Sequence, residues 1–105
     1  MPPETAPDAT PPIDFGHLRR YTLGDEALER EILGLFLTHT PQTLDVLRQS
    51  VNAIEWRAAA HGIKGSARAV GAHLVAELAA VAEAAYPEDE ALRQGQLTAL
   101  AEAIA

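Results

Sequence analysis

The sequence predicts an all-α fold, namely an antiparallel four-helix bundle with an additional short N-terminal helix. Four stretches carry apolar residues at the helical spacing of three and four: residues 25–51, 52–71, 73–86 and 88–105. No stretch shows the alternation with a period of two that a half-buried strand requires, and no Asn-Gly turn marks a hairpin. The connections between the four stretches are short, which favours antiparallel neighbours.

Length and composition set the scale of this bundle. The chain has 105 residues, which suits one small domain. Apolar residues make up 48% of it but aromatic residues only 5%, and much of the apolar content is alanine, which favours close contact between helices. There is no cysteine, so disulfide and thiolate chemistry are excluded, and we expect a cytoplasmic protein.

Charge and hydropathy exclude several kinds of partner. Eight basic and fifteen acidic residues give a net charge of −7, which argues against nucleic acid as the main partner. No apolar run approaches the roughly 20 residues needed to span a membrane. No basic start followed by an apolar segment indicates a signal peptide. We therefore expect neither nucleic acid nor membrane among the partners.

The N-terminal part divides into a tail and a short helix. Residues 1–12 contain five prolines and no large apolar residue after the initiator methionine, which predicts a disordered tail or the remnant of a linker. The bundle is expected to occupy residues 13–105. At its start Ile13, Phe15 and Leu18 recur at near-helical spacing, which predicts the short first helix.

The second predicted helix begins near Asp25 and ends near Val51. Its apolar stripe comprises Leu28, Ile32, Leu35 and Phe36, followed by Leu44, Val46 and Leu47. Pro41 interrupts the run, and a proline inside a helix removes a hydrogen bond and kinks the backbone. We favour one bent helix over two abutting helices, because no turn residues follow the proline.

The third predicted helix has clear ends. Asn52 with Glu55 three residues later has the form of a capping box, and Gly71 is a typical residue after a helix C-terminus. The buried face steps by four, three, four and three through Trp56, Ala60, Ile63, Ala67 and Val70.

Two further helices complete the bundle. Residues 73–86 are expected to turn Leu74, Leu78 and Val81 inward, and the following proline ends this helix. The last helix, residues 88–105, opens with three acidic residues, and Gly95 weakens it in the middle. Its apolar face comprises Leu92, Leu97, Leu100 and Ile104.

A second stripe on the third helix carries chemical groups. It comprises Arg57, His61, Lys64, Gly65 and Arg68. From His61 the next member is three or four residues on, at Lys64 or Gly65, so these residues form a solvent-accessible row beside the buried face. Three cations around an imidazole, on an otherwise acidic protein, indicate an anion as ligand. Histidine ordinarily titrates near pH 6.5, so its unprotonated nitrogen is a nucleophile at about neutral pH. This stripe therefore suits a phosphoryl group.

Lys64 and Gly65 have separate predicted roles in this stripe. Lys64, one turn from His61, can neutralise phosphoryl oxygens. Gly65 leaves room for a partner, which would explain a glycine that costs a helix roughly 1 kcal/mol relative to alanine. The neighbouring Gly62 has no such explanation. In the alternative interpretation, His61 is an ordinary surface histidine.

Counting residues outward from the turn at Gly71 adds Glu83 to the candidate site around His61. His61 lies about ten residues before this turn, and Glu83 lies about as far after it. An antiparallel hairpin places the two side chains level. The Glu83 carboxylate could then accept a hydrogen bond from Nδ1 of His61 and leave Nε2 available for attack. In the alternative, Glu83 is a solvated charge on its helix.

Other histidines and serines show no competing motif. His17, His39 and His73 lack a metal-ligand spacing such as H-E-x-x-H, so we expect no metal site. Ser66 follows a glycine but does not lie in the G-x-S-x-G elbow of hydrolases.

The residues around His61 resemble those of histidine-containing phosphotransfer (HPt) domains. Residues 60–67 read AHGIKGSA and are followed by a Gly-Ala pair, similar to the family signature A-H-x-L-K-G-S-A…G-A. The resemblance extends over roughly residues 13–86. This chain departs from the signature by an isoleucine for the commoner leucine and by a glycine directly after the histidine, where threonine or a larger residue is usual.

The resemblance implies an intermediate of a phosphorelay. His61 would accept a phosphoryl group at Nε2 from the aspartate of one receiver domain and pass it to another. Lys64 would neutralise the phosphoryl oxygens, and Gly65 would give clearance to the receiver. The partners would be response-regulator receiver domains and a hybrid histidine kinase. The Mg²⁺ would belong to the receiver, so this chain would need no cofactor.

The resemblance also implies a carrier and a docking surface. No Gly-rich nucleotide loop occurs, so the chain would be a carrier without autokinase activity and not an enzyme. Family receivers dock beside the histidine on apolar residues of the first helices. The candidates are Ile13, Phe15 and Leu18, with Arg57 and Arg68 as further partner-binding residues. Ordinary core packing is the alternative for the three apolar residues.

Three other interpretations of the bundle stay open. It could be a non-transferring adaptor that binds a receiver or a kinase. It could be the dimerisation and phosphoacceptor domain of a histidine kinase, but that class carries an acidic residue after the histidine, where this chain has Gly62, and we expect a monomer. An enzyme that uses His61 as a general base would need a partnered nucleophile, which the sequence does not offer.

Overall fold

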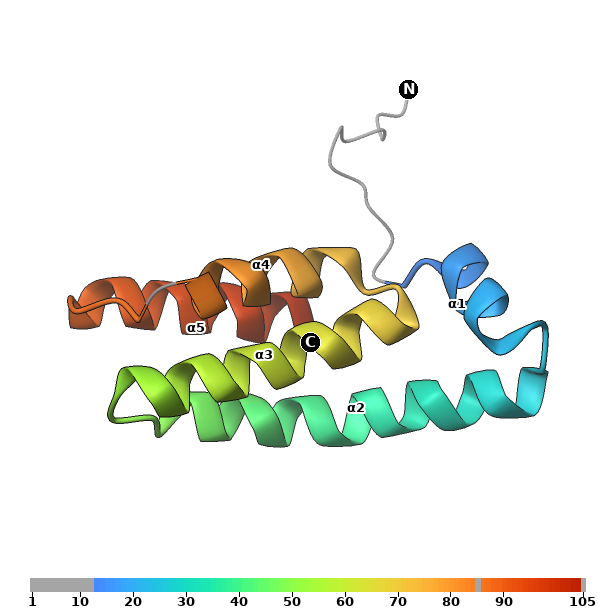
Figure 1. Cartoon of the computed structure of the whole chain (residues 1–105), viewed down its shortest axis with the longest axis horizontal. Coiled ribbons are helices and arrows are strands. Elements are labelled where there is room, and N and C mark those ends of the chain that lie inside the picture. The colour runs from blue at the N-terminus through green and yellow to red at the C-terminus, as the bar shows by residue number, and fades with distance from the viewer. Residues whose placement is uncertain (1–12, 85, 105) are drawn as a thin grey trace, which may run out of the picture.

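The computed structural model describes residues 13–84 and 86–104, which form five helices (Figure 1). The helices are α1 (Phe15–Thr22), α2 (Glu26–Arg48), α3 (Ala53–Val70), α4 (His73–Ala84) and α5 (Glu90–Ile104). Within these two ranges no residue lies in a strand, and α2 to α5 run alternately in opposite directions. The predicted all-α bundle is confirmed. The predicted tail, residues 1–12, lies outside the described residues.

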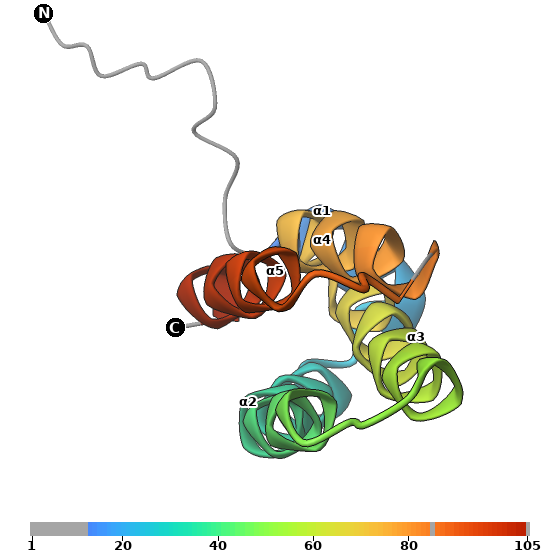
Figure 2. The ribbon, with the colours of Figure 1, turned by 90° about the vertical axis from the view of Figure 1, so that its left-hand side faces the viewer.

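The four long helices surround one core. α3 packs against α2 on one side and against α4 on the other, and α5 packs against both α4 and α2, which closes the ring (Figure 2). α1 contacts α2 and α3 at one end of the bundle. In this arrangement α3 and α5 are diagonal to each other, so the outer face of α3 points to solvent.

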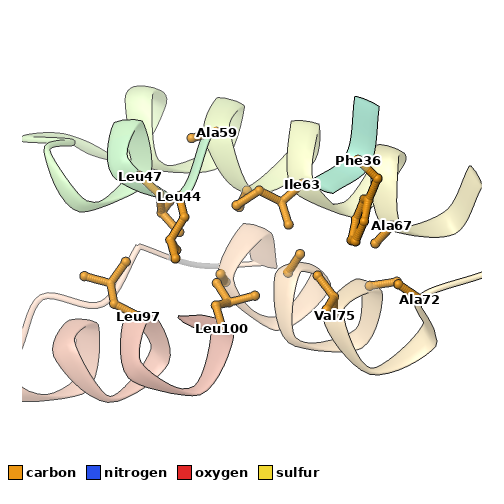
Figure 3. Packing of buried hydrophobic residues seen from close by; sticks show 14 of the residues in the cluster. Phe36, Leu44, Leu47, Ala59, Ile63, Ala67, Ala72, Val75, Leu97 and Leu100 are labelled. Carbon is orange, nitrogen blue, oxygen red and sulfur yellow. The ribbon is translucent and has the colours of Figure 1, made fainter. Parts of the chain in front are cut away.

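The buried face of α3 is the one that its sequence predicts. Trp56, Ala60, Ile63, Ala67 and Val70 are all buried, and Ala59 extends the same face. Figure 3 shows Ile63 of this helix across the core from Leu100 of α5 and Val75 of α4. Because these residues fix the rotation of α3, they also fix which of its side chains reach the surface.

Trp56 anchors α3 to α4. It is the largest fully buried side chain, and its Nε1–H donates to the backbone oxygen of Ala82 at 2.7 Å. The ring of Tyr86 packs edge-on against it, with the ring centroids 5.6 Å apart. A buried indole N–H is costly to leave unpaired, so this bond holds the two helices in one register.

Both ends of α3 form as predicted, with one variation. Asn52 Oδ1 accepts a hydrogen bond from the backbone N–H of Glu55 at 2.9 Å. Glu55 Oε1 accepts in turn from the backbone N–H of Val51 at 3.0 Å, whereas the standard capping box uses the N–H of the cap residue itself. Gly71 ends the helix in the left-handed conformation, with φ of 75°.

The helix α2 runs through Pro41 without a break, which confirms the prediction of a single helix. It ends at Arg48, earlier than predicted. Val51 therefore lies in the loop and is 76% exposed. The physical reason is that Asn52 adopts the extended backbone that caps α3, so the preceding residues cannot continue α2.

The predicted inward face of α4 is wrong. Leu74 and Val81 are 51% and 58% exposed, and Leu78 is half-buried. The helix instead buries its smaller residues, which are Val75, Ala76, Ala79 and Ala82. Small side chains let α4 lie close to α3, and this close packing turns the larger leucine and valine side chains toward the outer seam with α5. Leu92 of α5, also predicted inward, is exposed at that seam.

The helix α1 is fastened to the turn between α3 and α4. The backbone N–H of Asp14 donates to the oxygen of Gly71 at 2.9 Å. The Asp14 carboxylate accepts from the backbone N–H of His17 and lies 3.0 Å from Nε2 of His73. His17 Nε2 donates to the backbone oxygen of Arg68 at 2.8 Å. The His73 imidazole, and then the His17 N–H, lower the pKa of Asp14 below its ordinary value.

We expect the bundle to lose stability in acid through Asp14. The pKa of Asp14 is lower in the folded state than in the unfolded state. Its carboxylate therefore stabilises the fold above the unfolded pKa of about 4, and this stabilisation is lost as the pH falls through the folded-state pKa. Asp14→Asn keeps an oxygen that can cap α1 but removes the charge. In urea unfolding, the wild type should exceed Asp14→Asn in stability near pH 7, and the difference should shrink at about pH 3. Equal differences at both pH values would contradict this role.

Candidate functional site

His61 lies on the outer face of α3, opposite the residues that this helix buries. Its side chain is 69% exposed. Trp56 and Ile63, which are both about 1% exposed, hold the other side of the helix in the core. The imidazole is therefore presented to solvent by a helix that cannot rotate without exposing its buried face.

Glu83 reaches His61 from α4. Nδ1 of His61 lies 2.7 Å from Oε2 of Glu83, the contact expected from counting outward from the turn. An ionised carboxylate only accepts hydrogen bonds, so Nδ1 must carry the proton. Nε2 then keeps its lone pair, and an exposed imidazole in this tautomer can act as a nucleophile at Nε2.

Lys64 shares the same carboxylate. Its ammonium forms an ion pair with Oε1 of Glu83, so the two carboxylate oxygens serve one cation and one imidazole. The Lys64 side chain is only 18% exposed, whereas the sequence suggested a cation directed at an incoming anion. Lys64, and then His61, lower the pKa of Glu83, which keeps this carboxylate ionised near neutral pH.

No internal contact requires glycine at position 65. A Cβ placed on Gly65 would meet no atom within 4 Å, and one placed on Gly62 would meet only Thr43 Cγ2 at 3.8 Å, an ordinary contact. Both glycines lie inside α3, where alanine would favour the helix more. The open space at Gly65, one turn from His61, is available to another molecule.

The remaining predicted partner-binding residues are divided between surface and core. Arg57 and Arg68 are exposed on the same face of α3 as His61, and Phe15 is 59% exposed. Ile13 is half-buried and packs against the core cluster. Leu18 is fully buried, so the predicted contact of Leu18 with a partner is wrong and its alternative, core packing, holds. The inward side of α1 must cover α2 and α3, and Leu18 supplies the side chain that does so.

The structure has a groove between α2 and α3 that the sequence analysis did not predict. It encloses about 250 Å³ and is lined by Ile32, Leu35, Phe36, His39, Ser66, Ala69 and Val70. Leu35 is 50% exposed there, although its spacing assigned it to the buried stripe. The signal that could have revealed the groove is the small size of the residues after Gly65 on α3, because small side chains leave the facing leucine of α2 uncovered.

Metal and membrane sites receive no support from the described part of the chain. Among residues 13–84 and 86–104, no three His, Cys, Asp or Glu side chains gather as a metal site requires. None of the helices α1 to α5 combines the length and apolar character of a transmembrane span.

The small helical bundle, with an exposed histidine oriented by a carboxylate, has the form of a phosphotransfer domain. A family model described as Hpt domain matches residues 31–105, which is most of the chain. No curated protein and no solved structure matches it. The chain belongs to the Hpt domain family, and this membership indicates a histidine phosphotransfer role in a phosphorelay. Domains of this family act as phosphoryl carriers and interact with receiver domains and histidine kinases.

We expect Glu83 to fix the tautomer of His61. In Glu83→Ala the Nδ1 proton loses its acceptor, so the ring should populate the Nε2–H form more than the wild type does. The ¹⁵N chemical shifts of the two ring nitrogens measure this ratio directly. Glu77→Ala, an exposed change on the same helix, is the matched control and should leave the ratio unchanged. A wild-type ratio in Glu83→Ala would show that the carboxylate does not orient the ring.

Proposed function

We propose that His61 accepts a phosphoryl group from the phosphorylated aspartate of one receiver domain and passes it to the aspartate of another. Nε2 attacks phosphorus, an N–P bond forms, and the P–O bond to the aspartate breaks, so the carboxylate leaves with the electron pair. The reverse sequence of bonds delivers the group to the second receiver. The Nδ1–H contact with Glu83, which leaves the lone pair on Nε2 of a side chain that is 69% exposed, is the observation that supports this role.

Glu83 has a second effect once the N–P bond forms. With substituents on both nitrogens, the imidazole ring carries a positive charge. The carboxylate 2.7 Å from Nδ1 stabilises that charge without a proton having to leave. A protonated ring is also the better leaving group, so the same contact favours onward transfer.

Lys64 supplies the positive charge that would neutralise a phosphoryl group on His61. Its side chain is one helical turn from His61 and is held by Glu83 in the unmodified protein. A dianionic phosphoryl group on Nε2 would compete with Glu83 for this ammonium. Mg²⁺ would bind in the receiver, and no cofactor would be needed in this chain.

The receiver would dock over Gly65. The open space at this residue lies between His61 on the α4 side of α3 and the groove on the α2 side. Leu35 and Ala69 line the groove with apolar surface, and Phe15 is an exposed apolar side chain on α1. Arg57 and Arg68 would flank the acidic site of a receiver.

Transfer of ³²P from a phosphorylated receiver tests the function. We expect label to move to the wild-type chain and from it to a second receiver. His61→Gln should abolish this transfer, and His73→Gln, which can still donate a hydrogen bond to Asp14, should leave it intact. Loss of the label in acid together with its survival in alkali would identify phosphohistidine. Complex formation with the receiver but no labelling of the wild type would favour a non-transferring adaptor, and labelling of His61→Gln would place the acceptor elsewhere.

The two glycines of α3 give a matched pair of variants. Gly62→Ala and Gly65→Ala should each stabilise the protein by about 0.5–1 kcal/mol, because alanine favours a helix and neither methyl group meets an obstacle. Only Gly65→Ala should slow transfer from the receiver, by about tenfold or more, because its methyl group displaces the docked partner. Thermal unfolding and the transfer rate measure the two effects. Equal rates in both variants would remove the clearance role of Gly65.

A further inference from the structure

A second apolar groove lies between α4 and α5, on a different side of the bundle from His61. Leu78 and Val81 of α4 and Leu92 of α5 form its walls, and the groove encloses about 290 Å³. Val81 is two residues before Glu83 and so projects about 200° away from it around the helix. The groove and the phosphotransfer site are therefore on separate faces of the molecule.

Two of the lining residues, and a third residue next to the groove, are large apolar side chains that are exposed. Val81 is 58% exposed and Leu92 is 61% exposed, and Leu74, one turn before Leu78, is 51% exposed. Gln96 is the polar residue of the lining. Single exposed apolar residues are common on protein surfaces, but a hollow that gathers several of them from two helices is typical of an interaction site.

The floor of the groove suits a helix. Ala91, Gly95 and Ala99 of α5 all line it and recur at intervals of four residues, so they form one small-residue stripe along the helix. A Cβ at Gly95 would meet no atom within 4 Å, so the packing of the described residues does not require glycine there. A helix laid between α4 and α5 could approach this stripe closely while its apolar side chains contact Val81 and Leu92.

The charges around the groove are negative. Glu77 lies one turn before Val81 on α4, Glu88 to Glu90 lead into α5, and Glu102 lies one turn after Ala99. Arg93, the cation of α5, is directed elsewhere: its guanidinium lies 5.1 Å from the ring centre of Tyr86 and donates to the backbone oxygens of residues 87 and 88. A partner for this groove must therefore tolerate or complement an acidic rim.

We propose that the α4/α5 groove binds an amphipathic helix of a partner protein, with an apolar face flanked by lysine and arginine. Apolar side chains would fill the hollow, and the basic flanks would meet the acidic rim. A second copy of this chain is a poorer occupant, because a symmetric contact would bring two acidic rims together on molecules that each carry a net charge of −7. Because the groove is separate from the face of His61, such a partner could remain bound while a receiver docks. Where the helix and the receiver belong to one partner protein, binding of the helix would raise the local concentration of that receiver at His61.

Titration of the ¹⁵N-labelled chain with a synthetic helical peptide tests the proposal. The peptide carries leucines on one face and lysines beside them. Its controls are a scrambled peptide of the same composition and a peptide with glutamates in place of the lysines. We expect amide shifts confined to α4 and α5 for the lysine peptide alone. Leu92→Lys should weaken its binding about tenfold or more, because it removes apolar surface and adds a like charge.

The matched control is Ile54→Lys, which adds the same charge at a residue of α3 that is 81% exposed. It should leave binding of the lysine peptide nearly unchanged. Leu92→Lys should also keep the wild-type rate of phosphoryl transfer, so failure of the docking proposal and failure of the transfer proposal are distinguishable. Equal binding of the scrambled peptide, shifts that map to α2 and α3, or equal weakening by both variants would overturn the proposal. A dimer in light scattering that Leu92→Lys dissociates would assign the groove to a second copy and would also overturn it.

Discussion

The buried hydrogen bond from the Trp56 indole to the backbone oxygen of Ala82 sets the register of α3 against α4. Ala82 directly precedes Glu83, so the bond that pairs the indole also brings the carboxylate level with His61. A slip of one helical turn would move Glu83 by about 5.4 Å and break its contact with the imidazole. The alanines that face each other across this seam permit close approach but offer no shape that would resist sliding. The Trp56 bond supplies the directionality that they lack.

Glu83 also links two groups that would otherwise act separately. One oxygen holds Nδ1 of His61, and the other holds the ammonium of Lys64. A change at the imidazole is therefore transmitted to Lys64 through a single carboxylate. Coupled groups of this kind do not contribute additively, so the effect of replacing Lys64 depends on whether Glu83 is present. The site is one electrostatic unit drawn from two helices, not a row of independent side chains on α3.

The sequence predicted the contact between His61 and Glu83 because helical periodicity was unambiguous there. Trp56, Ala60 and Ile63 define the rotation of α3, and the turn at Gly71 allows Glu83 to be placed by counting. The same logic failed on α4, because alanine and leucine are both apolar and periodicity does not say which of two overlapping stripes faces the core. Close packing with α3 selected the alanines. Leu18 was misplaced for a related reason, since an eight-residue helix has too few turns to show which side is covered. The groove between α2 and α3, and the ion pair of Lys64, depend on side-chain contacts between helices that spacing within one helix cannot reveal.

The hydrogen bond between Asp14 and Gly71 has a consequence for recognition. The backbone oxygen of Asp14 lies only 2.7 Å from the position that a Cβ of residue 71 would occupy, so α1 and the hairpin of α3 and α4 meet backbone to backbone. Phe15, on α1, and the groove beside Ser66 then belong to one rigid body. A partner that contacts both does not have to restrict their relative motion when it binds. The entropy lost in forming the complex is correspondingly smaller, so a smaller apolar surface is enough to reach a given affinity.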